Sequence, residues 1–486
     1  MDIVSLLRLL VNGLIEAEAK FFSNPKDLYA LEKATKATTD AVAAQFMSVV
    51  LSSLDEQIRN SGVRNERYSV QRTRKRTLVS SVGDLTFDCT LYRRKGLAKG
   101  GYVSLLPQML GLDKHERFTE EAEVLLLTEA LKTSYAEAAR VLPSKQQITK
   151  TTVMNKVHGT ADEMPLQEPE EIKNAEYLFV EADEDHVAEQ HGDQTSAEEN
   201  GSFISKLVYV YENKSVTEGY TDRKQLINKF YFSGLYPGPE GNTKLWNKVQ
   251  AYIDSNYDTD KIKRVFVSGD AASWIKNGAD HLDKALFCAD KYHLMQYINH
   301  AAGQLKDEKE NVKNELWHLL YSKRKKAKAR FNEYTLRMLA SAEKTKSIED
   351  LRSYVLGNWA AVRRTLRNKL VNGCSAESHV SHVLSDRLSS RPMGWSQIGA
   401  DRMSKIRCYE RNHGREKMID LVRYSREKRN CQRTGTDDEM VKKVQVREII
   451  ADHYDQAKSY IERIQATIPG LTIRKTVSIR EQIHLL

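Results

Sequence analysis

The sequence predicts a multidomain α+β protein, and three observations support this fold class. The chain has 486 residues, of which 40% are hydrophobic, so it can bury the cores of several domains. Apolar residues recur at helical spacing in the first 60 residues, and the segment after residue 303 is helical and highly charged. Between residues 172 and 302, short apolar runs typical of strands alternate with helical segments.

The strand-rich segment has the element order of a ribonuclease-H-like core. Three apolar strands precede a helix at residues 245–256, and a fourth strand at 264–270 and a fifth at 285–288 follow. In a sheet of that type, the first strand is central and the fourth lies beside it. No strand pattern occurs over residues 303–370, so we expect an α/β catalytic core that is interrupted by an all-helical insertion.

These patterns divide the chain into seven regions. We expect an N-terminal helical region at 1–62, a basic β-hairpin region at 63–108, a helix-turn-helix DNA-binding region at 109–165, the first part of the core at 172–302, the helical insertion at 303–372, a return to the core at 373–400 and a basic C-terminal region at 401–486. The simplest interpretation of the first region is a helical bundle or an oligomerisation arm.

Residues 64–100 are predicted to form a β-hairpin with basic ends. Alternating apolar residues lie on both sides of Gly83 and Asp84, and only three acidic residues occur in the segment. Arginines at both ends of a hairpin can contact a phosphate backbone, and a solvated basic surface is the alternative. The residues that we expect to bind DNA here are Arg72, Arg74, Lys75, Arg76, Arg93 and Arg94.

Residues 117–161 have the pattern of three helices. An amphipathic helix over 118–132 is followed by a second over 134–142, a break at Pro143, and a third helix over 149–157. Small alanines before a short turn fit a helix-turn-helix, although helix pairs with short turns are common. In that arrangement the third helix would enter a DNA groove with Thr149, Lys150, Asn155 and Lys156.

Charge and cysteine usage indicate the compartment and the class of partner. The net charge is +9 and the pI is near 9.0, which permits a polyanionic partner. The five cysteines are scattered and form no CxxC pair, which favours a reducing compartment over a disulfide scaffold or a zinc ribbon. No apolar run reaches about 18 residues, and the first residues do not resemble a secretory signal. We therefore expect a cytoplasmic protein without a membrane anchor.

Two carboxylates follow apolar strands that the expected sheet would place side by side. Asp183 follows the run that starts at Leu178, and Asp270 follows the run that starts at Val265. Two carboxylates a few ångströms apart do not both stay ionised without a cation. Oxygen ligands suit Mg²⁺, and two such ions can support phosphodiester chemistry.

The third ligand is expected on a helix that packs at the same edge. Glu377 lies in the first turn of the amphipathic helix predicted over 375–388. Alternatives to Asp183 remain, because Glu181 and Asp185 share its face of a strand whereas Glu184 does not. The histidines His293, His379 and His382 lack zinc-like spacing, so packing or support of the site is the simpler role.

Several motifs, taken together, resemble the bacterial ISLre-type insertion-sequence transposases of the ISLre-two family, which are similar to Mutator-type DDE transposases. They are Leu178-Phe-Val-Glu-Ala-Asp183, Val267-Ser-Gly-Asp270-Ala-Ala-Ser-Trp274-Ile275, Asp290-Lys-Tyr-His293, Cys374-Ser-Ala-Glu377-Ser-His-Val-Ser-His382 and Ser389-Ser-Arg-Pro-Met-Gly-Trp395. The resemblance covers nearly the whole chain, including the basic hairpin. Members of this group are often described as an uncharacterised protein family.

The resemblance implies the site and its chemistry. Asp183, Asp270 and Glu377 correspond to the catalytic residues, which would bind two Mg²⁺ or Mn²⁺ ions. The accessory candidates are Asp185, Asp290, His293 and His382. The resemblance predicts a small residue after the first aspartate, whereas this chain has Glu184 and Asp185 there. Asp185 therefore remains an alternative to Asp183 as the first catalytic aspartate.

The implied activity is DNA strand cleavage followed by strand transfer. The implied partners are double-stranded DNA, as terminal inverted repeats and target DNA, and further copies of the chain. An inactive or domesticated DNA-binding relative is the first alternative, and a structural protein that assembles through its helical regions is the second.

Overall fold

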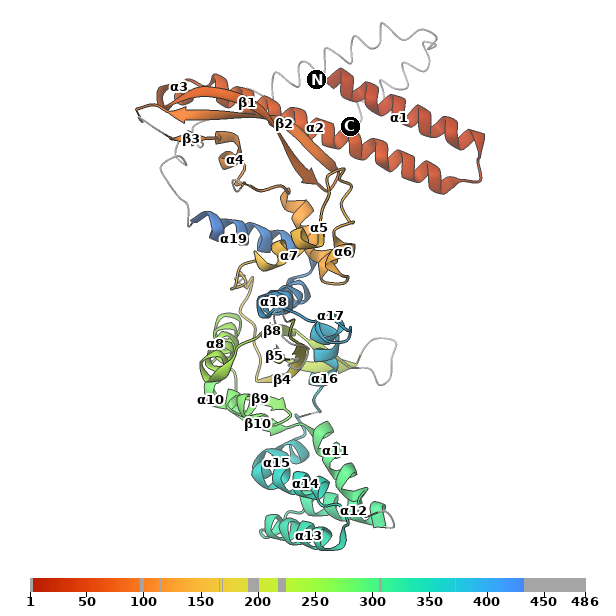
Figure 1. Ribbon diagram of the computed structural model, residues 1–486. Coiled ribbons are helices and arrows are strands. Elements are labelled where there is room, and N and C mark those ends of the chain that lie inside the picture. The colour runs from red at the N-terminus through yellow and green to blue at the C-terminus, as the bar shows by residue number, and fades with distance from the viewer. Residues whose placement is uncertain are drawn as a thin grey trace. The chain divides into compact units, whose positions relative to one another are not determined.

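The computed structural model describes residues 3–96, 100–112, 115–165, 167, 169–190, 201–216, 224–305, 308–371 and 373–431. Most of the predicted basic C-terminal region, residues 432–486, lies outside the described residues. Contacts within the chain divide it into two compact units (Figure 1). Of the described residues, the first contains those up to 127, those within 135–153 and residues 422–431, and the second contains those within 128–134 and 154–421.

Two long helices form the N-terminal part of the first unit. α1 (Ile3–Ser23) packs along α2 (Leu28–Asn60), and the short α3 (Gly62–Arg67) follows. The two helices approach closely at Gly13, where a Cβ atom would lie only 2.5 Å from Cγ2 of Thr38. The helices predicted for this region are confirmed.

The predicted β-hairpin is also confirmed. β1 (Tyr68–Ser80) and β2 (Gly83–Arg94) pair antiparallel from Tyr68 and Arg94 to Ser80 and Gly83, and β3 (Tyr102–Val103) pairs with the end of β2. The turn comprises residues 81–82, just before the Gly83-Asp84 pair on which the pattern is centred. Gly83 has a φ of +128°, which glycine tolerates best.

Polar side chains of α2 cover the edge of β2 that does not pair with β1. Ser48 Oγ accepts a hydrogen bond from the Thr86 amide at 3.0 Å, and Ser52 Oγ accepts one from the Asp88 amide at 3.1 Å. Farther along, Asp55 accepts hydrogen bonds from both the amide and the hydroxyl of Thr90. The helix thus supplies the acceptors that another strand would supply, and it shields this edge from further pairing.

The remaining described elements before residue 160 and after residue 413 are helical. They are α4 (Leu105–Met109), α5 (Glu120–Ala130), α6 (Tyr135–Ala138), α7 (Lys150–His158), the 3₁₀ turn η3 (Arg415–Lys417) and α19 (Met418–Cys431). The expected second helix over 134–142 is reduced to the single turn of α6. Pro143 and the turn that follows it come after this helix has already ended.

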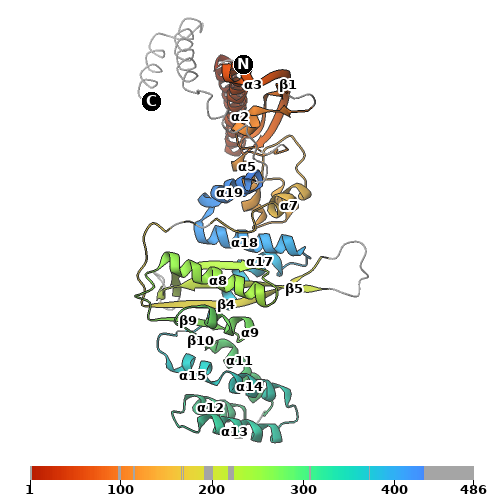
Figure 2. The same ribbon diagram turned by 90° about the vertical axis from the view of Figure 1, so that its left-hand side faces the viewer.

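A five-stranded mixed sheet forms the centre of the second unit (Figure 2). Its strands are β4 (Tyr177–Ala188), β5 (Ser202–Tyr211), β8 (Phe230–Gly234), β9 (Arg264–Gly269) and β10 (Ala285–Ala289). The strand order is β10-β9-β4-β5-β8, in which the β4/β5 and β5/β8 pairs are antiparallel and the β4/β9 and β9/β10 pairs are parallel. The first predicted strand is therefore central and lies beside the fourth, as expected. A separate two-stranded ribbon consists of β6 (Asn213–Val216) and β7 (Lys224–Ile227).

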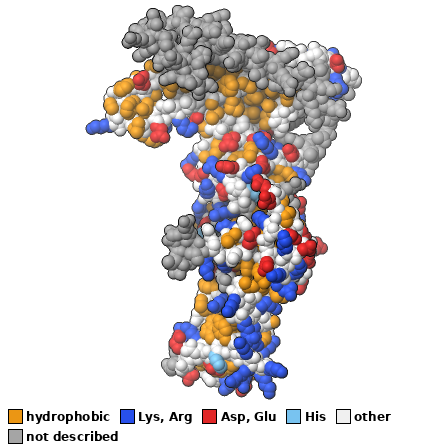
Figure 3. All heavy atoms as spheres, turned by 180° about the vertical axis from the view of Figure 1, so that it is seen from behind, with side chains coloured by type: hydrophobic (Ala, Val, Ile, Leu, Met, Phe, Trp, Pro, Cys, Tyr) orange, Lys and Arg blue, Asp and Glu red, His pale blue; other side chains and the backbone are white. Residues whose placement is uncertain are grey.

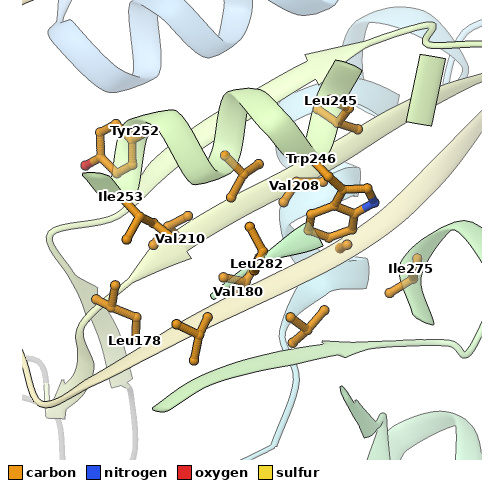
Figure 4. Close-up of a cluster of buried hydrophobic side chains, with 14 of the residues drawn as sticks. Leu178, Val180, Val208, Val210, Leu245, Trp246, Tyr252, Ile253, Ile275 and Leu282 are labelled. Carbon is orange, nitrogen blue, oxygen red and sulfur yellow. The ribbon is translucent and has the colours of Figure 1, made fainter. Parts of the chain in front are cut away.

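One face of the sheet packs against α8 (Gly238–Asn256), α9 (Ser273–Lys276) and α10 (Gly278–His281). Leu178 and Val180 of β4 point into this apolar cluster together with Trp246 and Ile253 of α8 (Figure 4). Because side chains alternate along a strand, the odd-numbered residues of β4 point to the opposite face.

The opposite face of β4 lies against a helical segment late in the chain. This segment comprises α16 (Ala376–Val380), the π-helical turn η2 (Ser381–Ser385) and α17 (Asp386–Leu388). α18 (Gln397–His413) follows and packs on β8 and β5. The expected domain boundary at residue 400 therefore falls within a helix of the second unit.

The described residues between β10 and α16 form helices only. These helices are α11 (Lys291–Ala302), α12 (Lys309–Tyr321), α13 (Ala327–Ser341), α14 (Lys346–Gly357) and α15 (Trp359–Arg367), and they share one apolar core. The Thr365 hydroxyl joins this segment to the sheet by donating a 2.6 Å hydrogen bond to the Ala289 carbonyl. Lys and Arg side chains gather on the surface of the segment, where residues 323–326 are all exposed (Figure 3). Among the described helices, none is long and apolar enough to cross a membrane.

Candidate active site

Asp183 of β4 lies near Asp270, which directly follows the adjacent parallel strand β9. The parallel pairing of the two strands ends at Glu181 of β4 and Ser268 of β9, two residues before Asp183 and Asp270. Burial raises the pKa of Asp183 to about 6, and the negative charge of Asp270 adds to this rise. The strand order thus brings together two carboxylates that are 87 residues apart in the sequence.

A third carboxylate lies at the end of the next strand. Asp290 follows β10, and its amide donates a 3.0 Å hydrogen bond to the carbonyl of Gly269, the residue before Asp270. Its carboxylate lies 2.8 Å from Nδ1 of His293. The hydrogen bond to Asp290 raises the pKa of His293, and the charges of Asp183 and Asp270 act in the same direction. The accessory candidates Asp290 and His293 therefore belong to the surroundings of the two aspartates.

The backbone around Asp270 is tightly constrained. Oδ1 of Asp270 accepts a 2.8 Å hydrogen bond from the Ala272 amide, and Ala271 between them has a φ of +73°. Such a conformation is strained for alanine and is typical of functional sites. Gly269 is required for close packing, because a Cβ atom there would lie 2.6 Å from the carbonyl oxygen of Ala182. The positive φ of Ala271 is not predictable from the sequence, because residue type alone does not reveal φ.

The alternative candidate Glu181 is the centre of a buried cluster that we call the Glu181 anchor. Its members, besides Glu181, are Tyr209, Tyr211, Lys214 and Ser375. Only 1% of the Glu181 side chain is exposed. Burial opposes ionisation of this carboxyl, but Lys214 and the hydrogen bonds from Tyr209, Tyr211 and Ser375 outweigh burial and lower its pKa. Glu181 is therefore fully engaged in ionic and hydrogen-bonding contacts within the protein.

Asp185 and Glu184 each accept side-chain hydrogen bonds from residues that do not contact Asp183 in this way. One carboxylate oxygen of Asp185 accepts hydrogen bonds from the hydroxyls of Ser385 at 3.0 Å and Ser389 at 2.8 Å. Burial raises the pKa of Asp185. Glu184 points to the other face, where it accepts a 2.7 Å hydrogen bond from the Trp274 indole. Of the four neighbouring acids on β4, Asp183 is the one that faces Asp270.

Glu377 lies in the first turn of α16, as the sequence predicts, and its side chain is exposed. Its helix covers the face of β4 that carries Asp183, and the π-helical turn begins four residues later. Such turns inside α-helices occur frequently at functional sites. His382 lies in this turn with an exposed ring 3.8 Å from the Asp386 carboxylate. Within the described residues, however, no group of three or more His, Cys, Asp or Glu side chains is close enough to hold a metal ion.

The donor chemistry of the two aspartates fits a hard divalent cation. Mg²⁺ is bound by one or two protein carboxylates, with water and substrate phosphates as the other ligands. The raised pKa of Asp183 shows that burial and the charge of Asp270 oppose its ionised form. A cation between the two carboxylates would relieve that penalty. Asp183 and Asp270 are therefore the residues that would hold the ion, with Glu377 on the covering helix.

Comparison with known proteins places the chain in a family. The model of the uncharacterised protein family UPF0236 matches residues 23–425. The chain belongs to UPF0236. Relatives in Caldanaerobacter subterraneus subsp. tengcongensis include one that is 29% identical over 392 residues, covering 80% of this chain and 79% of the relative. A UPF0236 protein of Streptococcus gallolyticus, named for its place in the vanSb 3′ region, is 22% identical over 418 residues, covering 81% of this chain and 85% of the relative.

One solved structure also matches this UPF0236 chain weakly. It is the Drosophila P element transposase strand transfer complex, with 12% sequence identity and a TM-score of 0.21. The match covers 68% of this chain and 94% of that chain. A TM-score this low does not establish a common fold.

The basic residues of the hairpin in this UPF0236 chain differ in their surroundings. Arg72 and Arg74 are exposed on β1, whereas Lys75 lies 2.9 Å from the Asp88 carboxylate. Arg76 is half-buried and donates a 2.9 Å hydrogen bond to the Glu116 carbonyl, and burial lowers its pKa. Arg93 and Arg94 are partly buried at the end of β2. Arg72 and Arg74 are thus the hairpin arginines most accessible to a partner.

The residues proposed to contact DNA bases lie on or next to α7. Thr149 caps this helix, because its hydroxyl accepts a 3.2 Å hydrogen bond from the Thr152 amide. Lys150 and Asn155 are exposed, and Lys156 is partly buried. Lys150 and Asn155 are therefore the best placed of the four for contact with a partner.

Proposed function

We propose that this chain is a DDE transposase of the ISLre type with a ribonuclease-H-like catalytic core. It binds the terminal inverted repeats of an insertion sequence, cleaves DNA with Mg²⁺ and transfers the cut strand to target DNA. The observation that carries the proposal is the closeness of Asp183 on β4 to Asp270, which directly follows the adjacent parallel strand β9. The carboxylate pair fits metal-dependent phosphodiester chemistry.

The topology of the sheet supports the proposal. Three antiparallel strands come first, and two parallel strands are added beside the first strand. This is the arrangement expected of a ribonuclease-H-like core from the order of its elements. The helices between β10 and α16 occupy the place of the proposed insertion, ahead of Glu377.

The distribution of relatives within one genome also supports a mobile element. One UPF0236 protein of Caldanaerobacter subterraneus subsp. tengcongensis has a name that joins eleven loci of that genome. A second relative, 30% identical over 381 residues and covering 78% of this chain and 77% of the relative, joins four loci. Repeated occurrence of one protein in a genome is typical of an element that moves its own gene.

In this mechanism the protein positions the reacting groups. Asp183, Asp270 and Glu377 would hold the divalent ions, two of which activate the attacking water or 3′-hydroxyl and stabilise the leaving oxygen when bound. His293, held by Asp290, provides a positive charge beside the two aspartates when it is protonated. The exposed Arg72, Arg74 and Lys150 would contact phosphates, and Asn155 would contact base edges.

The proposal is tested by a cleavage assay on DNA that carries the ends of the element. The purified chain should nick this DNA with Mg²⁺, and Asp270→Asn should abolish nicking while binding the same DNA with unchanged affinity. Asp280→Asn is a matched control, because it changes an exposed aspartate on the nearby α10. Cleavage by Asp270→Asn at the normal rate would overturn the proposed site.

A DNA-binding protein without nuclease activity is the second candidate. It is favoured by the exposure of Glu377 and by the absence of a three-residue metal cluster within the described residues. Salt-dependent DNA binding without nicking, in Mg²⁺ or Mn²⁺, would support this candidate over the transposase.

A further inference from the structure

The Glu181 anchor holds the chain immediately ahead of the helix that carries Glu377. Ser375 donates two hydrogen bonds to Glu181, from its amide at 2.7 Å and from its hydroxyl at 2.9 Å. Lys214, which lies 3.2 Å from Glu181, also donates a 2.9 Å hydrogen bond to the Gly373 carbonyl. Both members of the buried ion pair are thus hydrogen-bonded to the turn over residues 373–375. α16 begins at the next residue.

A second attachment fixes the other end of the same helical segment. Asp185 accepts hydrogen bonds from Ser385 and Ser389, at the end of η2 and just after α17. Glu181, Asp183 and Asp185 lie on one face of β4 at alternating positions. Asp183 therefore lies between two attachment points that join its strand to the segment containing Glu377. A segment attached at both ends cannot slide along the strand.

Stability alone does not account for the buried ion pair. The Glu181 and Lys214 side chains are only 1% and 11% exposed. Removing both charges from water costs about as much free energy as their attraction returns, and apolar residues of similar volume often serve a core equally well. Apolar residues cannot direct an amide and a hydroxyl to one point, whereas a carboxylate can. The contribution specific to this pair is therefore the position of Ser375.

We propose that Glu181 and Lys214 are positioning residues, which hold Glu377 in a fixed place relative to Asp183. The inference rests on the proposed function, because Glu377 requires a fixed place only if it serves the cation. Neither Glu181 nor Lys214 is proposed to touch the DNA or the ion. They act through the turn at 373–375.

The test compares Glu181→Gln and Lys214→Met with the unaltered full chain and with Asp401→Asn. Asp401 is a matched control, because it also accepts a backbone hydrogen bond, from Leu235 at 3.1 Å, and lies 2.7 Å from a lysine, Lys405. Hydrogen exchange of the peptide over residues 373–380 reports whether the anchor holds the turn. The Mn²⁺ concentration that gives half-maximal cleavage of element-end DNA reports whether Glu377 is in place, and DNA affinity is measured alongside.

We expect both anchor variants to exchange faster over residues 373–380 and to need at least tenfold more Mn²⁺, with DNA affinity unchanged. Asp401→Asn should alter neither quantity. Faster exchange with an unchanged Mn²⁺ requirement would overturn the positioning role and leave a purely structural anchor. Unchanged exchange would overturn the anchor itself. Absence of cation-dependent cleavage by the unaltered chain would instead overturn the proposed function, and this inference with it.

Discussion

The amide of Asp290 donates a 3.0 Å hydrogen bond to the carbonyl of Gly269, the residue that precedes Asp270. This contact joins the ends of β9 and β10, and it places the Asp290–His293 pair beside the two aspartates. The hydrogen bond to Asp290 raises the pKa of His293 most, and the charges of Asp183 and Asp270 raise it further.

Replacing Asp290 should lower the pKa of His293. In Asp290→Asn the imidazolium loses its 2.8 Å charged partner, so its protonated form is less favoured. Because the folded pKa is raised, the pair stabilises the native state below the unfolded pKa, and this contribution is lost as pH rises through the folded pKa. NMR titration of the His293 ring measures the shift, with Asp280→Asn as the control. An unchanged titration in Asp290→Asn would contradict this pairing.

Removing the charge of Asp183 should stabilise the protein at neutral pH. The folded pKa of about 6 lies above the ordinary aspartate pKa of 3.8, so the folded state binds this proton more tightly than the unfolded state. Stability is therefore lost as pH rises from about 4 to about 6, and Asp183→Asn should not suffer this loss. At pH 7.5 without divalent ions, we expect the variant to be more stable by on the order of 1–3 kcal/mol. Urea denaturation at pH 4 and pH 7.5 measures the difference.

Divalent ions provide the complementary measurement. Mg²⁺ should stabilise the unaltered chain at pH 7.5 more than at pH 5, because protons and the cation compete for Asp183. The same addition should have little effect on Asp183→Asn. Equal stabilisation of both proteins would place the ion elsewhere.

Ala271→Gly should be neutral or stabilising, although glycine usually weakens a fold. Ala271 has a φ of +73°, and glycine adopts that conformation without strain, for a gain of up to about 1 kcal/mol. The neighbouring Ala272→Gly is the control, since Ala272 has a φ of −54° and its replacement should lower stability. Thermal denaturation of both variants separates the two effects. A clear loss of stability in Ala271→Gly would show that the alanine methyl group outweighs the strain.

Asp55 should be essential for packing α2 against β2. Asp55→Leu leaves both the amide and the hydroxyl of Thr90 without their acceptor, at a cost of about 2–3 kcal/mol. Asp55→Asn keeps one acceptor and should cost less than half of that. Urea denaturation monitors both variants. Equal losses would indicate that the charge of Asp55, rather than its acceptor atoms, matters.

Arg72 and Arg74 should differ from Arg76 in their effect on DNA binding. The double variant Arg72→Ala/Arg74→Ala should fold normally and reduce the slope of log affinity against log salt by about 2, one unit for each lost phosphate contact. Arg76→Ala should instead lower stability, because Arg76 is half-buried and bonded to the Glu116 carbonyl. Fluorescence anisotropy at several salt concentrations, together with denaturation curves, tests both outcomes. An unchanged slope in the double variant would exclude this surface from DNA binding.

The sequence alone determined the helices at the N-terminus, the hairpin over residues 68–94, the strand that contains Asp183 and the strand that ends just before Asp270. It did not determine the end of the first of these strands, because β4 continues past Asp183 to Ala188. These features depend on local periodicity, which adjacent residues encode directly. It also determined that residues 181, 183 and 185 share one face, because side chains alternate along any strand. Local pattern left the choice among these three acids open, and it gave no sign of the π-helical turn or of the backbone at Ala271.

The tertiary structure decided which acid faces Asp270. Glu181 is engaged by Ser375, which lies 194 residues away, and Asp185 is engaged by Ser385 and Ser389, which are still more distant. Contacts over such separations depend on how the sheet and the late helices pack, and no local pattern encodes that packing. The role of each carboxylate on β4 thus follows from its partner across the fold, because its residue type and its position on the strand are nearly the same as those of its neighbours.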